Sequence, residues 1–389
     1  MARDIVRALV LDQGPGLWGA QKYLLRLRPG LAERGVELTL GCPPQLEQYR
    51  HWLDQGLPTI PLALPIDRSI RVDGRITVRH TATEVRNSLR AGHLIARVVR
   101  EHGFDVVLAN SHWTHLDAGL AARRWRIPTV LNLHETPMPG VGSRLREVAV
   151  AAAHHTIAVS TSVADTVRTG LRSRVTVIPN GVDTDEFAPA ADTATRAALR
   201  TRLGLPAGRP IILAATRIDP TKRIEDLLDL ARVVGDRATV VVAGTTSAFP
   251  DYHREILAAA AELPTGAITF LGARDDVPSL LAGADVFVHT GVVEGMPLGL
   301  VEAQSAGVPV VAYAAAGVRE AVLDGTSGRV VGCGDTGALI AACADLLADA
   351  DRRRDYAAAA RAHTLAHHRI DDQAAANATL LHRISRGPR

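Results

Sequence analysis

Short apolar runs alternate with longer amphipathic segments along the whole chain. Runs rich in Val, Ile and Leu predict strands at residues 5–11, 37–40, 105–109, 129–133, 156–159 and 175–178. A second series is predicted at residues 211–215, 239–243, 267–271, 286–289 and 308–311. Strands separated by helix-length segments are typical of parallel sheets joined by right-handed helical crossovers. The pattern therefore predicts a doubly wound α/β fold, repeated as two Rossmann-like units.

The chain length supports two domains, because 389 residues exceed a usual single core and fit two units of about 180 residues. Turn formers and small residues interrupt the periodic pattern at residues 183–208, where we expect a linker. We expect an N-terminal domain over residues 1–185 and a C-terminal domain over residues 186–369. Residues 370–389 are expected to form a helix that crosses back to the first domain.

Composition narrows the functional classes. The chain is 47% hydrophobic, 22% charged and 4% aromatic, as in soluble globular proteins. No apolar stretch is long enough to cross a bilayer and no signal-peptide core follows Met1, so we expect a cytoplasmic protein. Three scattered cysteines predict neither a disulfide framework nor a zinc site. The net charge of +3 suits an anionic ligand but is too small to indicate a nucleic-acid partner.

The segment ADVFVHTGVVEGMPLGLVEAQSAGVPVVA, residues 284–312, combines several chemical features. An apolar strand leads into a loop, and Pro297 opens a helix whose first N–H groups are expected to bind a phosphate. Helical side chains lean toward the N-terminus, which brings Glu302 within reach of two ribose hydroxyls, while Glu294 faces a sugar. Either glutamate alone is more simply a solvated residue, but the combination favours a binding site. The expected contacts are Glu294, Met296, Leu298, Gly299, Leu300 and Glu302.

Two basic residues follow the first strand of the second unit. Arg217 comes directly after that strand and Lys222 lies near the start of the next helix, so both are expected at the carboxyl edge of the sheet, where open α/β sheets bind ligands. Such residues are common on solvated helix faces. The chain has only two lysines, Lys22 and Lys222, and the placement of one here favours a diphosphate grip.

Two features of the first unit are weaker evidence for a ligand-binding site. Gly14, Gly16 and Gly19 follow the first strand, but their spacing differs from that of a dinucleotide fingerprint. His134 ends a strand and is expected to face the ligand, although a lone histidine there is more often structural. Pro29 and Gly30 are expected to kink the helix after the glycines.

Together these motifs resemble the retaining glycosyltransferases of the GT-B fold, family 4 or group 1, over nearly the whole chain. The resemblance rests on Glu294 and Glu302 with seven residues between them, on Arg217 with Lys222, and on the runs VIPNGVD (177–183), LGARDDVPSLLAGADVFV (271–288) and AAAGVREAVLDGTSGRVV (314–331). It implies two Rossmann-like domains that face a central cleft. Where the family usually has Gly-Gly-Ala-Glu, this chain has Trp-Gly-Ala-Gln at residues 18–21.

The resemblance also implies roles. Arg217 and Lys222 would hold the diphosphate of a nucleotide sugar, Glu302 the ribose and Glu294 the transferred sugar or its leaving phosphate. His134 would stand near the anomeric centre, and Gly19 would approach the donor. Catalytic roles are thus expected for His134, Glu294, Arg217 and Lys222. UDP is the commonest donor nucleotide of the family and GDP the second.

The expected reaction is retaining transfer by front-side substitution, without a protein nucleophile, a metal or another cofactor, because no Asp, Glu and His cluster has metal-site spacing. A sugar-nucleotide epimerase, a phosphorylase and a non-catalytic nucleotide-sugar-binding module are the alternatives. The acceptor is expected to be small and soluble, such as a sugar, a cyclitol or an aminoglycoside-type intermediate of natural-product biosynthesis. It would lie against Asn110, His112, Trp113 and Glu135.

A stripe of basic residues keeps a membrane-bound acceptor as an alternative. On the helix predicted at residues 83–101, the cations are expected on one face, opposite Val85, Leu89, Ala96 and Val99. Such a stripe suits anionic lipid and a lipid or cell-envelope glycan acceptor. Because that helix has no Trp or Phe anchor, we favour a solvated face. The stripe consists of Arg86, Arg90, His93, Arg97 and Arg100.

Overall fold

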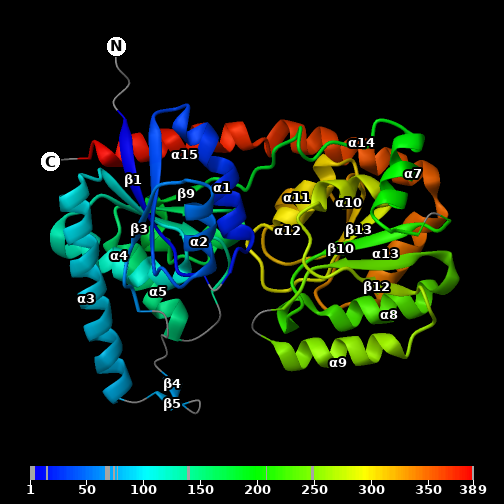
Figure 1. The fold of residues 1–389 in the computed structure, drawn as a ribbon, viewed down its shortest axis with the longest axis horizontal. Helices are drawn as coiled ribbons and strands as arrows, with labels where there is room; N and C mark the ends of the chain where they lie inside the picture. Colours follow the sequence, from blue (N-terminus) through cyan, green and yellow to red (C-terminus); the bar gives the residue numbers. More distant parts are fainter. Residues whose placement is uncertain are drawn as a thin grey trace. The chain divides into compact units, whose positions relative to one another are not determined.

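The computed structural model describes residues 5–14, 16–65, 71–72, 75–76, 78–137, 141–206, 208–246 and 249–387. The chain divides into two compact units (Figure 1). Unit 1 comprises residues 1–179 and 371–389, and unit 2 comprises residues 180–370. The division precedes the boundary predicted after residue 185, and the C-terminal segment is part of unit 1.

Unit 1 is built on a parallel sheet in the order β3-β2-β1-β6-β7-β8-β9. Its strands are β1 (Val6–Leu11), β2 (Val36–Cys42), β3 (Thr59–Pro61), β6 (Val106–Ala109), β7 (Thr129–Leu133), β8 (His155–Ala158) and β9 (Val175–Val177). The apolar runs predicted all of them except β3. A short antiparallel pair, β4 (Arg71–Val72) and β5 (Arg75–Ile76), lies outside this sheet.

The helices of unit 1 are α1 (Gly19–Ala32), α2 (Glu47–Asp54), α3 (Val78–His102), α4 (His112–Trp125), α5 (Val141–Ala152), α6 (Thr161–Asp165) and α15 (Ile370–Ser385), with the 3-10 helix η1 (Thr169–Arg174). Helix α1 continues through Pro29 to Ala32. A Cβ on Gly30 would lie 2.8 Å from the Cβ of Ala374, so glycine allows α15 to pack closely on α1. His382 Nε2 and the carbonyl oxygen of Arg34, 2.9 Å apart, add a polar contact to this packing.

Unit 2 repeats the design with six parallel strands in the order β12-β11-β10-β13-β14-β15. They are β10 (Ile211–Ala215), β11 (Thr239–Ala243), β12 (Ile268–Phe270), β13 (Val286–His289), β14 (Val310–Tyr313) and β15 (Gly328–Val331). The pattern missed only β15. In each sheet the strand order changes direction between two neighbouring central strands, as in Rossmann-like folds. These strands are β1 and β6 in unit 1, and β10 and β13 in unit 2.

The helices of unit 2 are α7 (Thr193–Arg202), α8 (Ile224–Val234), α9 (Pro250–Ala261), α10 (Val277–Gly283), α11 (Leu298–Ser305), α12 (Val318–Ala321), α13 (Thr336–Ala348) and α14 (Ala350–His367), with the 3-10 helices η2 (Pro220–Lys222) and η3 (Gly235–Arg237). The linker predicted at residues 183–208 is wrong in part, because α7 lies within it. Arg196 and Arg200 of α7 both bind Asp285, at 2.8 and 2.6 Å, and tie this polar helix to the start of β13.

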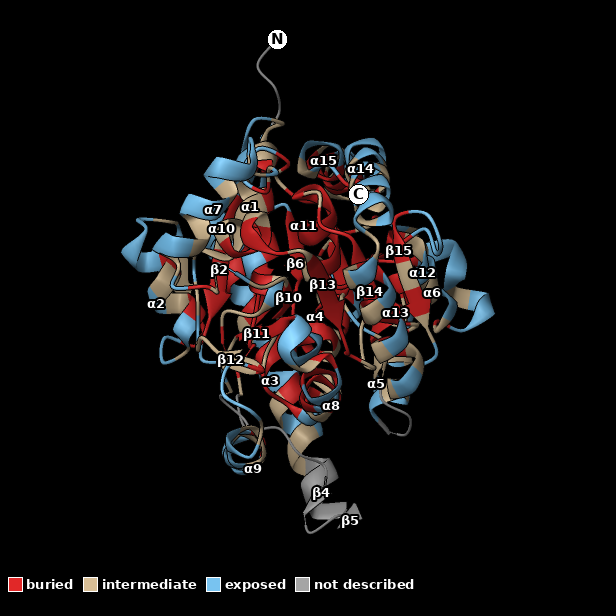
Figure 2. Cartoon of the chain, turned by 90° about the vertical axis from the view of Figure 1, so that its right-hand side faces the viewer, coloured by how far each residue is buried: buried red, intermediate tan, exposed pale blue. Residues whose placement is uncertain are grey.

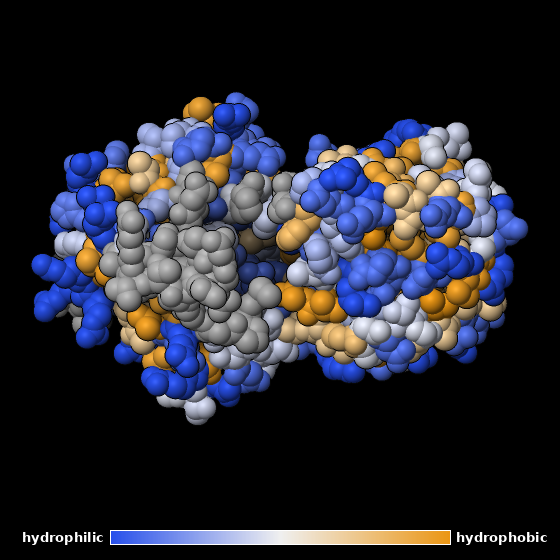
Figure 3. Space-filling model, turned by 90° about the horizontal axis from the view of Figure 1, so that it is seen from below, coloured by the Kyte–Doolittle hydropathy of each residue, from blue (hydrophilic) through white to orange (hydrophobic). Residues whose placement is uncertain are grey.

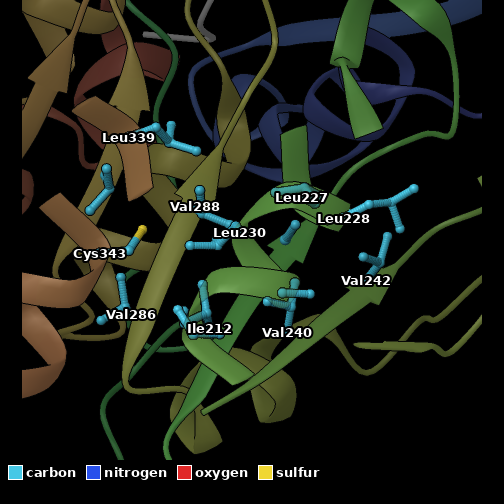
Figure 4. Packing of buried hydrophobic residues seen from close by; sticks show 14 of the residues in the cluster. Ile212, Leu227, Leu228, Leu230, Val240, Val242, Val286, Val288, Leu339 and Cys343 are labelled. Atoms are coloured by element: carbon cyan, nitrogen blue, oxygen red, sulfur yellow. The ribbon is translucent and has the colours of Figure 1, made fainter. Parts of the chain in front are cut away.

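The core of unit 2 forms where α8 and α13 cover the sheet. Figure 4 shows Leu227 and Leu230 of α8 and Leu339 and Cys343 of α13 beside side chains of β10, β11 and β13. These residues are almost fully buried. Burying one such side chain contributes about 1.5–3 kcal/mol, so this layer is a main source of the unit's stability.

Burial follows the layers in both units. Strands such as β13 and β14 are buried, whereas α9 is largely exposed (Figure 2). The face seen in Figure 3 mixes hydrophilic and hydrophobic residues. Among the residues that the structure describes, no helix combines the length and the apolar composition needed to span a bilayer.

Candidate functional site

The sheet of unit 2 brings its candidate residues to one edge. The sheet order places β10 beside β13, and the winding direction reverses between them. Ligands of doubly wound folds bind at such a switch point, outside the carboxyl ends of the strands. Arg217 follows β10, and the loop with Glu294 follows β13, so both lie at the predicted carboxyl edge of the sheet. The strand order, which the sequence did not predict, shows that they flank the switch point.

Glu294 is the centre of a buried charge cluster. Its Oε1 forms an ion pair with Lys222 Nζ and lies 3.0 Å from His289 Nε2. The side chains of Lys222 and Glu294 are 12% and 11% exposed, which excludes an ordinary solvated loop acid. Burial opposes ionisation, but Lys222 and His289 outweigh it and lower the pKa of Glu294 to about 2. Glu294 is therefore an ionised carboxylate at neutral pH.

Two hydrogen bonds to backbone carbonyl oxygens join the two loops that carry this cluster. Thr290 Oγ1 donates a hydrogen bond to the carbonyl oxygen of Lys222 at 2.6 Å, and Val292 N–H donates to the carbonyl oxygen of Thr221 at 2.9 Å. A Cβ on Gly291 would collide with the Glu294 carboxylate and lie 2.7 Å from His289 Nε2. A larger residue at position 291 would therefore displace the side chains of the ion-pair cluster.

Arg217 lies on the exposed side of the same edge. Its guanidinium forms an ion pair with Asp219 at 3.1 Å and is 37% exposed. Asp219 also accepts a hydrogen bond from Thr221 N–H at 2.9 Å, which caps η2 just before Lys222. Arg217 and Lys222 are therefore linked through one short, ordered turn.

Helix α11 starts close to the sheet. A Cβ on Gly299 would lie 3.1 Å from Phe287 Cζ, so glycine lets the helix N-terminus approach β13. Leu300 N–H already donates to the carbonyl oxygen of Pro297 at 3.2 Å. The prediction of three available N–H groups is therefore wrong for Leu300, and Leu298 and Gly299 are the phosphate candidates at this terminus.

The other donor-side candidates are buried. Glu302 on α11 is 9% exposed, which excludes the solvated-helix alternative. Met296 is 4% exposed, and its carbonyl oxygen accepts a hydrogen bond from Asn180 Nδ2 at 2.8 Å. A Cβ on Gly317, whose φ is +72°, would collide with the carbonyl oxygen of Gly295. The loop before α11 is therefore closely packed.

Unit 1 carries a buried polar ladder at its own switch point. Leu11 pairs with Ala109 and Ala109 with Leu131, so the next residues, Asp12, Asn110 and Asn132, lie side by side. Asn110 Nδ2 is 2.7 Å from Asp12 Oδ2, and Asn132 Nδ2 is 3.3 Å from Asn110 Oδ1. Asn110 was predicted to contact the acceptor, but it is 0% exposed and its amide is engaged within the ladder. We therefore assign it a supporting position.

His134 joins this ladder. Its Nε2 lies 2.9 Å from Asn110 Oδ1, and its ring is partly buried. Burial, aided by the nearby His112, lowers the pKa of His134 to about 4. The ring is thus neutral at physiological pH, which suits a hydrogen-bonding role rather than a positive charge.

The remaining candidates of unit 1 lie nearer the surface. His112 Nδ1 and Glu135 Oε1 are 3.2 Å apart, and Trp113 is 39% exposed. Gly19 is the first residue of α1. Just before it, Trp18 N–H donates to Gln21 Oε1 at 3.2 Å, and Gln21 Nε2 donates to Asp12 at 3.0 Å.

The basic stripe on α3 is exposed, and the predicted apolar face is wrong in part. Val85 and Leu89 are 55% and 53% exposed, while Ala96 and Val99 are buried. The buried face of α3 instead includes Ser88, Ala91 and Ile95. Arg97 forms an i,i+4 ion pair with Glu101 at 3.7 Å, so part of the stripe is neutralised within the helix.

Several supporting residues escaped sequence reasoning. His289 ends a strand that the pattern predicted correctly, and only the fold shows that its ring faces Glu294. Asn180 was noted only within a family motif, and Asp12 and Gln21 only within a glycine-rich turn. The available signal was a polar residue at or near the carboxyl end of a predicted strand: Asp12 directly after one, His289 as the last residue of another, and Asn132 next to the last residue of a third. In the described part of the chain, no group of three or more His, Cys, Asp and Glu residues is arranged to hold a metal ion.

The site in unit 2 has the chemistry of a diphosphate-binding site. It places two cations, an acid and a helix N-terminus at the switch point of a Rossmann-like sheet. The profile described as glycosyl transferases group 1 matches residues 195–363, and the profile described as Glycosyltransferase Family 4 matches residues 18–186. The chain belongs to the group 1, or family 4, glycosyltransferases of the GT-B fold, and is therefore an enzyme that transfers glycosyl groups.

Relatives and solved structures agree with this assignment. D-inositol 3-phosphate glycosyltransferase of Xylanimonas cellulosilytica is 32% identical over 378 residues, covering 88% of this chain and 87% of the relative. A GDP-mannose-dependent alpha-(1-6)-phosphatidylinositol monomannoside mannosyltransferase of Mycolicibacterium smegmatis is 36% identical over 198 residues, covering 47% of this chain and 50% of the relative. The structure of Anabaena Alr3699/HepE with UDP and glucose has a TM-score of 0.80 at 22% identity, covering 97% of this chain and 99% of that chain, and supports the fold.

Proposed function

We propose that this enzyme transfers a sugar, with retention of configuration, from a nucleotide-diphosphate sugar to a small soluble acceptor. The observation that carries the proposal is the buried cluster of Lys222, Glu294 and His289 at the switch point of unit 2. The cluster holds the charged side chains of Lys222 and Glu294 in fixed positions before a charged ligand binds. Lys222 and Arg217 then hold the diphosphate.

Glu302 and Glu294 contact the remaining parts of the donor. Glu302 lies one helical turn into α11, beyond the N–H groups of Leu298 and Gly299, where its carboxylate accepts hydrogen bonds from the ribose. Glu294, already ionised, orients the sugar or its leaving phosphate. We propose UDP as the nucleotide, supported by the UDP named in similar structures, with GDP as the second candidate because a relative is named GDP-mannose-dependent.

The reaction is proposed to need no metal, because the two cations and the helix N-terminus stabilise the departing diphosphate. Front-side attack by the acceptor hydroxyl breaks the bond from the anomeric carbon to phosphate oxygen and forms the new glycosidic bond on the same face. The acceptor's proton leaves with the diphosphate. His134, Glu135, His112 and Trp113 are proposed to lie near the sugar and acceptor.

A cyclitol or its phosphate is the first acceptor to test, because the relatives that cover most of this chain are named for D-inositol 3-phosphate. Purified enzyme is incubated with UDP- or GDP-sugars and with inositol, inositol 3-phosphate or aminocyclitols, with and without excess EDTA. We expect an α-linked product from an α-linked donor, seen by NMR, and unchanged activity in EDTA. An inverted product, or loss of activity in EDTA, would refute the mechanism.

The same assay separates the alternatives. An epimerase or phosphorylase would change the donor without a glycosylated acceptor, and a binding module would bind the donor without turnover. Lys222→Ala and Arg217→Ala are each expected to lower transfer at least tenfold, since a charge-assisted contact is worth about 1.5–3 kcal/mol. Arg232→Ala, an exposed position on α8, is the control. Transfer only to lipid acceptors in anionic liposomes would defeat the soluble-acceptor proposal.

A further inference from the structure

The polar ladder of unit 1 ends on His134, and its hydrogen bonds restrict where the proton of that ring sits. The ladder starts at Asp12, which is 1% exposed. Its carboxylate faces donors: Gly14 N–H at 2.8 Å, Gln21 Nε2 at 3.0 Å, Gln48 Nε2 at 3.4 Å and Asn110 Nδ2 at 2.7 Å. Burial raises the pKa of Asp12, while the hydrogen bonds from Asn110, Gly14 and Gln21 lower it and stabilise the ionised form. As a carboxylate, Asp12 only accepts hydrogen bonds.

The orientation of the Asn110 amide follows from this surrounding. Because Asp12 accepts, Asn110 must turn its NH2 group toward Asp12 and its oxygen toward the other side. That oxygen lies 3.3 Å from Asn132 Nδ2 and 2.9 Å from His134 Nε2. An amide oxygen can only accept, so His134 Nε2 must carry the hydrogen.

We propose that Asp12 is a positioning residue which, through Asn110, fixes His134 as the Nε2–H tautomer and leaves Nδ1 as a hydrogen-bond acceptor. A neutral imidazole has one N–H, so a hydrogen on Nε2 requires a bare Nδ1. The partly buried ring thus offers a ligand hydroxyl an acceptor atom. This last step rests on the proposed function, whereas the tautomer itself does not.

The opposite arrangement shows why Asp12 decides the tautomer. A group that donates at the position of Asp12 Oδ2 would turn the Asn110 amide over, so that its NH2 group faces His134. Nε2 would then accept, and the hydrogen would move to Nδ1. Asp12→Asn makes this change with almost no change in shape, because its Oδ1 position still meets the Gly14 and Gln21 donors and its NH2 group meets Asn110. Gln21 then keeps only its contact with the Oδ1 position, and Asn132 must turn its own amide so that its oxygen faces the Asn110 NH2 group.

The test is long-range 15N NMR of the histidine rings in the ligand-free full-length protein. The His134 signals are assigned by their loss in His134→Gln. We expect a protonated Nε2 and a bare Nδ1 in the wild type, and the reverse in Asp12→Asn. Asp117→Asn, another buried acid of unit 1 that lies on α4 outside the ladder, should leave the wild-type tautomer. A wild-type Nδ1–H tautomer, or an unchanged tautomer in Asp12→Asn, would overturn the proposal.

Kinetics then connect the tautomer to turnover. We expect Asp12→Asn to lower kcat at least tenfold with less than a threefold change in the KM of the donor, while Asp117→Asn of equal thermal stability retains kcat. Full kcat with an inverted tautomer would contradict the role of Nδ1. Should Asp12→Asn not fold, the wild-type spectrum still decides the assignment. An Nε2–H tautomer in a protein that transfers no sugar would instead refute the proposed function alone.

Discussion

At the scale of single residues, Glu294 is held by two partners in the candidate site of unit 2, Lys222 and His289. Its ordinary pKa of 4.5 falls to about 2 because the attraction of Lys222 and His289 exceeds the cost of burial. The folded pKa lies below the unfolded one, so this stabilisation is complete above pH 4.5 and is lost as the pH falls toward 2. At every pH suitable for the enzyme, Glu294 is therefore an anion.

Glu294→Gln tests this anion. The amide keeps the shape but leaves Lys222 without its counter-charge, so we expect kcat to fall tenfold or more while donor affinity changes little. Glu302→Ala should give the converse, a weaker donor affinity with a smaller effect on kcat. Steady-state kinetics and calorimetric titration with the nucleotide sugar separate the two. Equal effects on both parameters in the two variants would contradict this division of roles.

The side-chain amide of Gln21 suits its position because its neighbour is the buried acid Asp12. The resembling family has glutamate at this position, and here the Gln21 amide donates to the buried Asp12 carboxylate at 3.0 and 3.1 Å. Gln21→Glu would place two carboxylates in contact, so one of them must bind a proton. We expect a loss of unfolding free energy of about 2–4 kcal/mol at pH 7.5 that becomes smaller as the pH is lowered.

Chemical denaturation at several pH values measures this loss. Lys22→Gln is the matched control, because it changes the charge by the same amount at the neighbouring, exposed position. A Gln21→Glu protein as stable as the control at pH 7.5 would show that Asp12 does not need a donor there.

At the scale of elements, the junction between η2 and α8 fixes Lys222. Arg223 follows Lys222 with φ 47° and ψ 57°, a left-handed conformation that costs a residue with a Cβ about 1 kcal/mol or more. Its guanidinium compensates by donating to Asp226 at 2.6 and 2.9 Å. Asp226 is buried and also accepts from Tyr313 Oη at 2.6 Å. The junction is therefore held by a side-chain network instead of by glycine.

Two substitutions separate the backbone and side-chain parts of this junction. Arg223→Gly and Arg223→Ala both remove the ion pair, but only alanine retains the left-handed strain, so alanine should be less stable by about 1 kcal/mol. The order reverses at Arg232, inside α8, where glycine is expected to be less stable than alanine. Thermal and denaturant unfolding of the four variants measures both differences. The same order at the two positions would contradict the strain argument.

Elements with strong apolar periodicity were predictable, and those held by tertiary contacts were not. Strands such as β7, β10 and β13 are mainly apolar segments whose bounds matched the prediction. By contrast, β3 is three residues long and contains Pro61, and α7 is polar and depends on the contact of Arg196 and Arg200 with Asp285. Local sequence carries little information about such contacts.

The candidate site shows the same division. Glu294, Lys222 and Arg217 could be predicted because the carboxyl edge of a parallel sheet is where their segments end. Their partner His289 is five residues from Glu294, and their contact depends on the conformation of the loop after β13. The ladder from Asp12 to His134 depends on which strands are neighbours and in which register they pair. Strand order is a property of the fold, so spacing along the chain did not reveal these contacts.

At the scale of the whole molecule, each unit contains a buried neutral histidine whose protonation opposes folding. In unit 1, burial, together with the nearby His112 and His134, lowers the pKa of His115 to about 3. In unit 2, burial lowers the pKa of His368 to about 4, and its Nδ1 lies 3.0 Å from the carbonyl oxygen of Asn180. The unfolded chain binds these protons near pH 6.5. Stability is therefore complete above pH 6.5 and decreases as the pH falls toward the folded pKa values.

We expect each of these two histidines to remove about 2 kcal/mol of unfolding free energy between pH 7.5 and pH 5, since each unit of pH below the unfolded pKa costs about 1.4 kcal/mol. Calorimetric unfolding at pH 7.5, 6.5, 5.8 and 5 measures the decrease. His115→Gln should make unit 1 less sensitive to pH, and His368→Gln should do so for unit 2, even where the substitution lowers stability at pH 7.5. His93→Gln, at an exposed position on α3, should retain the wild-type pH dependence. A wild-type stability that is constant from pH 7.5 to pH 5 would contradict the neutral burial of both histidines, because protons taken up only by the unfolded chain must shift the folding equilibrium.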